Sequence, residues 1–172
     1  TEFPHLHLTV RHNGKAVDPF APSPVPGACA SEQTLWDEAT AAALVYRRRV
    51  MLNHGFSERV LSMADVENLQ PGEATPTSQS PALIAYVRMI GLEAGDTAQL
   101  VLRAPGGTVI AEKRLPALER AQAQTLALIG RKQPAAGWPG GTYLAEYLVT
   151  NVGQTVFSKQ FSMPMGPVRP GQ

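Results

Sequence analysis

The sequence has little cysteine, little charge and no long apolar run. The chain has one cysteine, Cys29, so an intrachain disulfide is excluded. Cys29 is either a buried thiol or a residue that pairs with a group outside these 172 residues. No apolar stretch approaches the roughly 20 residues that span a bilayer as a helix. Charged residues make up 17% of the chain, below the usual ~25%. A disordered acidic or basic tail and a membrane-spanning helix are therefore excluded.

The few charges are also balanced. Fifteen Lys and Arg stand against fourteen Asp and Glu, and the longest basic run is Arg47-Arg48-Arg49. Nucleic-acid and anionic-membrane surfaces need a basic excess or a basic patch. The composition argues against both kinds of partner.

The sequence is rich in turn-forming residues. Glycine and proline each occur 15 times among 172 residues, above their usual combined share of ~12%. This excess favours a β-rich fold with many turns over a helical bundle. The length allows one ordinary domain, with or without attached pieces.

Residues 5 to 18 predict a β-hairpin. Polar side chains alternate with apolar ones: His5, His7 and Thr9 against Leu6, Leu8 and Val10. Alternation of this kind gives a strand one polar face and one buried apolar face. Asn13-Gly14 is a strong signal for a two-residue turn, since both residues tolerate a positive φ. The chain should return through Ala16 and Val17.

The middle of the chain is mixed. Residues 19–28 contain four prolines and predict a stiff connector. Residues 31–46 predict a helix capped by Ser31 or Thr34, with a strand over 44–52 as the alternative for its end. Ser62 opens a short helical turn that Pro71-Gly72 closes, and a second Pro-rich loop covers 71–81.

From residue 82 onward the pattern is one of short strands separated by turn clusters. The predicted strands are 82–91, 97–104, 108–115, 124–130, 141–150 and 154–162. Strands at this spacing indicate an antiparallel sandwich. We expect a mainly β fold: an antiparallel immunoglobulin-like β-sandwich at 81–165, a hairpin at 1–20, a mixed α/β lead-in at 21–80 and a flexible tail at 166–172. Trp138, between two glycines, is expected to plug the end of the sandwich rather than stack on a ligand.

His5 and His7 are the strongest candidates for a catalytic or metal-binding role. On one strand their Cβ atoms lie roughly 6.5–7 Å apart, given a rise of ~3.3 Å per residue. One imidazole can then bind a metal while the other contacts the metal-bound water or the substrate. The alternative is a pair of polar residues on a solvated strand face. Two histidines at this spacing are by themselves a weak signal.

The residues around His5 and His7 strengthen this signal. Pro4-His5-Leu6-His7-Leu8, Asn13-Gly14-Lys15 and Val17-Asp18-Pro19 together resemble the closing segment of the lysostaphin-like (LytM-type) zinc metallopeptidases of bacterial cell walls. The match covers residues 3 to 20. The resemblance implies that His7 is a zinc ligand, that His5 is a catalytic histidine and that zinc acts as a Lewis acid on the attacking water. It implies a periplasmic or extracellular location and peptidoglycan as substrate. Ser80 to Met163 looks like the immunoglobulin-like domain that follows the peptidase in some members.

The sequence also departs from that family. Members take two further zinc ligands from an H-x-x-x-D segment, which these 172 residues do not contain. His54 and Glu58 have H-x-x-x-E spacing, but they are expected in a loop, with His54 an ordinary surface residue. His12 should be exposed, and Asp18 should accept turn hydrogen bonds.

Thr1 is expected to lie inside a longer polypeptide whose peptidase domain is a partner of this segment. The 172 residues alone are expected to hold zinc weakly, if at all, and to be inactive as a peptidase. The alternatives are a non-catalytic module that binds or regulates an envelope protein, and a structural sandwich without a site.

Overall fold

The computed structural model describes residues 8–20, 34–44, 47–70, 72–73 and 75–166. The chain divides into two compact units, Thr1–Tyr46 and Arg47–Gln172. The sequence analysis placed the start of the sandwich near residue 81. The structural division falls earlier, because the strand and helix between residues 50 and 68 pack with the sandwich.

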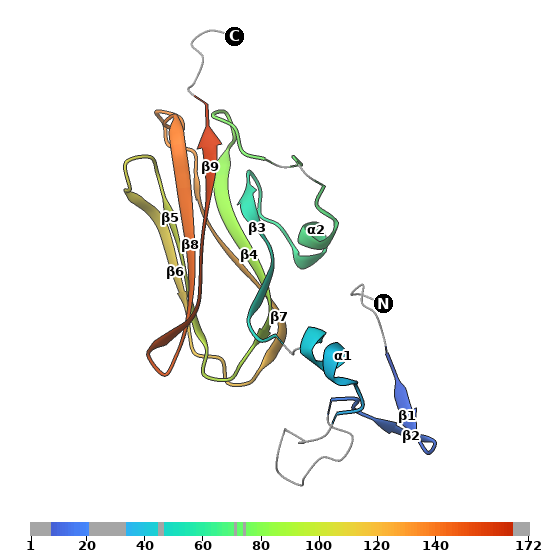
Figure 1. The fold of residues 1–172 in the computed structure, drawn as a ribbon. Coiled ribbons are helices and arrows are strands. Elements are labelled where there is room, and N and C mark those ends of the chain that lie inside the picture. The colour runs from blue at the N-terminus through green and yellow to red at the C-terminus, as the bar shows by residue number, and fades with distance from the viewer. Residues whose placement is uncertain (1–7, 21–33, 45–46, 71, 74, 167–172) are drawn as a thin grey trace. The chain divides into compact units, whose positions relative to one another are not determined.

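The first unit contains the predicted hairpin. Strand β1 (Val10–His12) pairs antiparallel with β2 (Lys15–Val17), as Figure 1 shows. Asn13 and Gly14 have φ values of 50° and 77°, a turn geometry that asparagine and glycine tolerate better than other residues. The hairpin is confirmed, but the expected burial of its apolar face is wrong at Leu8, which is 65% exposed. No second layer packs on this two-stranded sheet among the described residues.

The first unit also contains one short helix, α1 (Glu38–Ala43). Its N-cap is Asp37, whose carboxylate accepts a hydrogen bond from the Thr40 N–H at 2.9 Å. The predicted cap at Thr34 is wrong, because the Thr34 hydroxyl donates to the Pro19 carbonyl at 3.0 Å instead. The other predicted cap, Ser31, lies outside the described residues. The helix is therefore shorter than the predicted 31–46.

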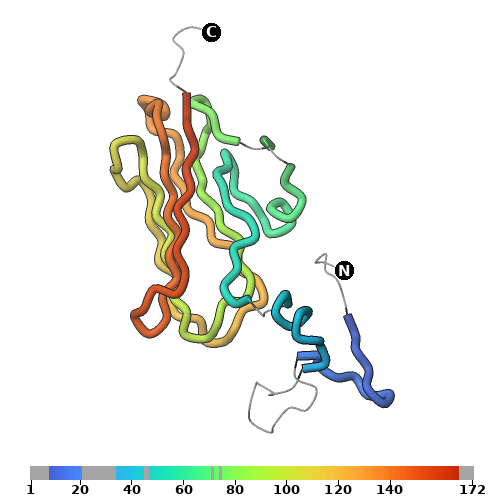
Figure 2. Tube along the Cα trace, in the orientation of Figure 1, coloured from blue at the N-terminus to red at the C-terminus, as the bar shows by residue number. Residues whose placement is uncertain are grey.

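The second unit is an antiparallel β-sandwich of two sheets (Figures 1 and 2). One sheet has the order β3-β4-β7, with β3 Val50–Ser57, β4 Ala82–Leu92 and β7 Gln122–Lys132. The other has the order β6-β5-β8-β9, with β6 Val109–Leu115, β5 Thr97–Arg103, β8 Gly141–Asn151 and β9 Gln154–Met165. All six strands predicted after residue 82 are confirmed.

The connections of the sandwich are those of an immunoglobulin-like fold. The chain changes sheet between β4 and β5, between β6 and β7, and between β7 and β8. Such crossovers between a three-stranded and a four-stranded antiparallel sheet give a Greek-key sandwich. The fold class expected from the sequence, mainly β and antiparallel, is confirmed.

The core lies between the two sheets. Alternate residues of β5 and β8 face inward. The buried core side chains include Leu83, Ala85, Val87, Met89, Leu100, Leu102, Tyr143, Ala145, Tyr147, Val149, Met163 and Met165. Burying each large apolar side chain stabilises the fold by about 1.5–3 kcal/mol. On β9, Val156, Ser158 and Gln160 are exposed.

Tyr147, in the centre of this core, is expected to make the stability of the sandwich fall at high pH. Burial, with a smaller contribution from the negative charge of Asp96, raises the pKa of Tyr147 to about 12. The stability that this neutral phenol contributes is complete below its unfolded pKa of ~10 and is lost as pH rises from 10 towards 12. The loss can reach about 2 to 3 kcal/mol. We expect Tyr147→Phe to remove that part of the pH dependence when urea unfolding is measured between pH 9 and 12.

The short helix α2 (Met63–Asn68) covers the outer face of the three-stranded sheet (Figure 1). Ser62 and Asp65 form a reciprocal capping box, so the predicted start at Ser62 is confirmed. The helix buries a second apolar cluster made of Leu61, Val66, Leu69, Tyr86, Leu126 and Leu128. Neither described helix has the length or the apolar character that crossing a bilayer requires.

Candidate functional site

The predicted catalytic and metal residues, His5 and His7, lie outside the described residues. The part of their motif that the structure describes behaves as expected at two positions. His12 is exposed at the end of β1. The Asp18 carboxylate accepts a hydrogen bond from the Phe20 N–H at 2.9 Å, which is the turn role predicted for it.

The second candidate pair, His54 and Glu58, does not form a metal site. Both were expected in a loop, but His54 lies in β3, where residues 53–57 pair one after another with β4. The His54 ring stacks on Phe161 with the ring centres 4.8 Å apart. The Glu58 carboxylate accepts a hydrogen bond from Ser80 at 2.7 Å. Across the described parts of the chain, no three His, Cys, Asp or Glu side chains gather where they could hold a metal ion.

The arginine trio, Arg47, Arg48 and Arg49, lies before β3, which begins at Val50. The alternative of a strand over 44–52 therefore does not hold at these three residues. Arg49 has a φ of 54°, a backbone conformation that bulky residues seldom adopt. Its side chain turns inward to Asp96, which lies at the end of the β4–β5 loop.

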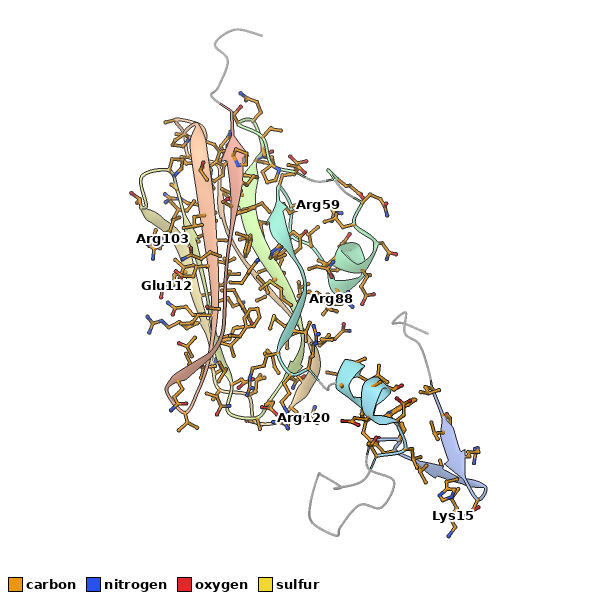
Figure 3. All side chains as sticks on the ribbon, in the orientation of Figure 1. Lys15, Arg59, Arg88, Arg103, Glu112 and Arg120 are labelled. Carbon is orange, nitrogen blue, oxygen red and sulfur yellow. The ribbon has the colours of Figure 1, made fainter. Side chains whose placement is uncertain are left out.

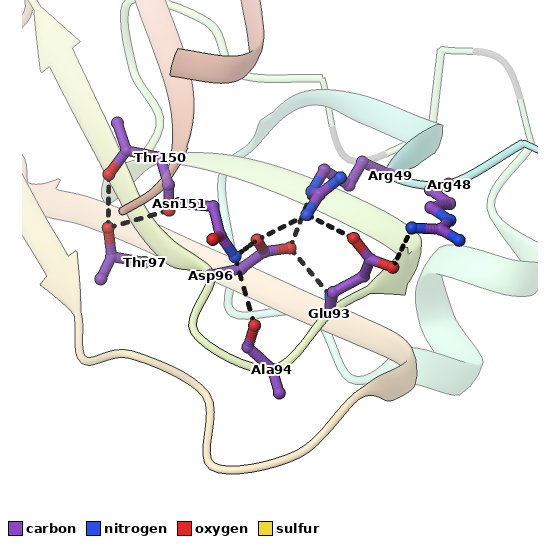
Figure 4. A network of polar contacts seen from close by, with 8 residues as sticks. All are labelled: Arg48, Arg49, Glu93, Ala94, Asp96, Thr97, Thr150 and Asn151. Atoms are coloured by element: carbon purple, nitrogen blue, oxygen red, sulfur yellow. Dashed lines mark hydrogen bonds and ion pairs between the residues drawn. The ribbon is translucent and has the colours of Figure 1, made fainter. Parts of the chain in front are cut away.

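Figure 4 shows the network that holds Arg49 there. Its guanidinium donates to Asp96 at 2.9 and 3.0 Å and to Glu93 at 2.6 Å. Asp96 also accepts from Asn151 at 2.7 Å and from the Glu93 N–H at 2.8 Å. Three segments, the entry to β3, the β4–β5 loop and the β8–β9 hairpin, are thereby joined at one end of the sandwich.

The electrostatics of this network identify it as a structural element. Burial alone would raise the pKa of Asp96, which is 2% exposed. The hydrogen bonds that it accepts, with those from Arg49 foremost, outweigh burial and hold its pKa below the usual value. The hydrogen bond to Asp96 likewise raises the pKa of Arg49. Each charged group of the network has a partner of opposite charge.

A second buried ion pair lies under α2. Arg88 of β4 donates to Glu67 at 2.7 Å, to Asn53 at 3.2 Å and to Gln124 at 3.2 Å (Figure 3). It binds the helix to all three strands of its sheet. No local pattern predicts this pair, because Arg88 stands in an otherwise apolar strand and Glu67 is 21 residues away.

Trp138 is a plug, as predicted. Its ring is 2% exposed and its indole N–H donates to the Ser80 carbonyl at 2.7 Å. The ring contacts Tyr143 edge-on, with the ring centres 6.2 Å apart. The side chain closes the sandwich between the β7–β8 loop and the start of β4.

The surface of the sandwich has several hollows. One, of about 460 Å³, lies along β3 and β9 and is lined by Arg47, Arg49, Val50, Met51, Leu52, His54, Phe157 and Lys159. Another, of about 330 Å³, lies beside β7. We name it the β7 pocket; its walls are Val60, Ala82, Ile84 and residues 128–132. Sequence reasoning missed both, because each combines residues far apart in the chain.

The chain matches no profile of a known protein family and no curated protein. Among solved structures, it resembles parts of β-glucuronidases from Parabacteroides merdae and Bifidobacterium dentium. The identities are 16% and 13%, the TM-scores are 0.39 and 0.37, and the aligned parts cover 52% and 69% of this chain. They span only 12% and 18% of the two enzymes.

A third likeness is to the cupredoxin domain of amoB from Nitrosocaldus yellowstonii. Its identity is 11% and its TM-score is 0.32, with 74% of this chain and 94% of that domain covered. Identities and TM-scores as low as these say nothing about what the present chain binds or catalyses.

Proposed function

We propose that this chain is the C-terminal part of an exported zinc endopeptidase that acts on peptide cross-links of bacterial peptidoglycan. The observation that carries the proposal is the order of motifs at residues 3 to 20: the paired histidines, the Asn13-Gly14 turn and the Asp18-Pro19 exit. The described hairpin supports it, because β1 and β2 pair in register on either side of that turn.

In this proposal His7 is a ligand of the zinc ion and His5 a catalytic histidine. Zinc would supply Lewis acidity to the attacking water. The described residues do not gather a ligand set of their own, and the sequence holds no H-x-x-x-D segment. The proposal places the further ligands on another segment of the natural protein and leaves the 172 residues alone without peptidase activity.

The test uses the natural polypeptide that carries these residues. We expect His7→Ala to lose bound zinc and the release of peptide fragments from peptidoglycan. We expect His5→Ala to keep its zinc while hydrolysis slows by roughly a hundredfold or more, which is the usual loss for a general acid–base group. Zinc is measured by elemental analysis after dialysis, and hydrolysis by fragment release.

His12→Ala is the matched control, because His12 is an exposed histidine of the same hairpin. It should leave both zinc content and hydrolysis unchanged. The proposal fails if His7→Ala retains a full equivalent of zinc, or if the natural polypeptide neither binds zinc nor releases fragments.

The second candidate function is a non-catalytic module that binds or regulates another envelope protein. The β7 pocket favours it, since an apolar hollow beside a strand edge suits a protein ligand better than a reaction. The His7→Ala test separates the two, because a binding module needs neither zinc nor hydrolysis.

A further inference from the structure

Strand β7 is an edge strand of the sandwich. The sheet order β3-β4-β7 gives it one neighbour, β4, to which it pairs continuously from Gln122 to Lys132. Within the described residues, its backbone makes no hydrogen bond outside that pairing. Its other side therefore presents a row of backbone N–H and C=O groups.

The other three edge strands carry features that discourage further pairing. Strand β3 has a register shift between Met51 and Asn53. Strand β6 has three consecutive charged residues at 112–114, and β9 has Lys159 and Pro164. Charges, prolines and bulges are the usual means by which edges are blocked.

Strand β7 has none of these features over residues 122–130, and its two charged residues, Arg131 and Lys132, are its last two. Residues 121–130, AQAQTLALIG, include no charge and no proline, and the pairing with β4 has no register shift. A long uncharged edge of this kind readily accepts another strand. Of the four edges, it is the one open to pairing.

The β7 pocket lies at this edge. Five consecutive residues of β7, 128–132, line it. Because successive residues of a strand point to opposite faces, a hollow that touches all five is lined by backbone atoms of β7 as well as by side chains. Its other walls are apolar: Ala82, Ile84 and Val60, which is 72% exposed. A strand added here could place an apolar side chain in the pocket.

The charges at the two ends of β7 favour a peptide over a second copy of β7 as the added strand. Arg120 stands before β7 (Figure 3), and Arg131 and Lys132 stand at its other end. In an antiparallel pair of two copies of β7, the cations of one end would oppose those of the other, and like charges opposite each other are destabilising. A peptide with acidic ends would meet a cation at each end.

We propose that the free edge of β7 binds an extended peptide as an added antiparallel strand. The peptide places an apolar side chain in the β7 pocket and acidic residues near Arg120 and near Arg131 and Lys132. Backbone hydrogen bonds supply affinity, and the pocket and the cations supply selectivity. This inference does not depend on His5 or His7, so it stands or falls separately from the peptidase proposal.

The test titrates the full chain into a fluorescein-labelled peptide that has glutamates at both ends and alternating valine and threonine between them. We expect saturable binding by fluorescence anisotropy and slowed amide hydrogen exchange over residues 122–132. The double variant Arg131→Glu with Lys132→Glu should weaken binding about tenfold, by replacing attraction with repulsion at one end. Val60→Asp should weaken it severalfold by making the pocket polar.

Three controls accompany the titration. Lys159→Glu, on the β9 edge at the other end of the four-stranded sheet, should leave binding within about twofold, since a distant exposed charge contributes little. A peptide with lysines in place of its glutamates should bind the native chain weakly and the double variant better. Circular dichroism should show that each variant melts as the native chain does, because all the altered side chains are exposed.

Four outcomes would overturn the proposal: no saturable binding, equal binding of the glutamate and lysine peptides, no effect of the double variant, or exchange protection on another edge. Formation of a dimer at high protein concentration, with protection at 122–132, would also overturn it. The edge would then serve a second copy of the chain and not an acidic peptide.

Discussion

Replacing Trp138 with alanine is expected to lower the free energy of unfolding of the sandwich by about 3 to 5 kcal/mol, the usual cost of removing a large buried aromatic side chain. The change empties the space that the ring fills beside Tyr143. It also removes the indole donor and leaves the Ser80 carbonyl without that hydrogen bond. Urea unfolding followed by far-ultraviolet circular dichroism measures the effect.

Two variants separate the contributions to this loss. Trp138→Phe keeps most of the apolar ring but not the N–H, and should cost about 1 to 3 kcal/mol for the carbonyl left unsatisfied. Trp36→Ala changes the other tryptophan, which belongs to the first unit, and should leave the unfolding of the sandwich within about 0.5 kcal/mol of the native value. A loss below 1 kcal/mol for Trp138→Ala would contradict the role of this residue as a plug.

Replacing Asp96 with alanine is expected to cost about 3 to 5 kcal/mol, as when one partner of a buried ion pair is removed. Arg49 would keep only Glu93 as its partner, and Asn151 would lose its 2.7 Å hydrogen bond. The guanidinium charge would remain half-buried with less compensation. The free energy of unfolding, again from urea titration, should show the loss.

The matched control is an ion pair on the surface. Glu112→Ala removes the partner of Arg114 on β6, where both side chains are well exposed, and should change stability by no more than about 1 kcal/mol. If Asp96→Ala costs no more than this control, the network of Figure 4 does not hold the end of the sandwich together.

The sequence predicted the second half of the fold well. Buried residues alternate with more exposed ones, as in Tyr143, Ala145 and Tyr147, which indicates the two-residue period of a strand. Turn clusters between these segments mark the strand boundaries. The strand considered as an alternative over 44–52 overlaps β3 only from Val50 onward. The positive φ of Arg49 turns the chain just before Val50, and no local pattern among three arginines marks such a turn.

The polar networks could not be predicted in the same way. Arg49 and Asp96 are 47 residues apart, and each alone looks like an ordinary loop charge. Their pairing follows from the sheet topology, which brings the entry to β3 against the β4–β5 loop. The helix cap was missed for a different reason, since Thr34, Asp37 and Ser31 are all good caps by type and only the path of the chain selects Asp37. His5 and His7 remain predictions.

The arrangement of β3 and β9 has a mechanical consequence. The sandwich is entered at the start of β3 and left at the end of β9, and the two strands run in the same direction along the same side (Figure 1). Tension applied through the chain would pull β3 lengthwise past β4. The hydrogen bonds of an antiparallel pair are perpendicular to its strands, so such a pull loads the bonds between β3 and β4 together, in shear, instead of opening them one after another.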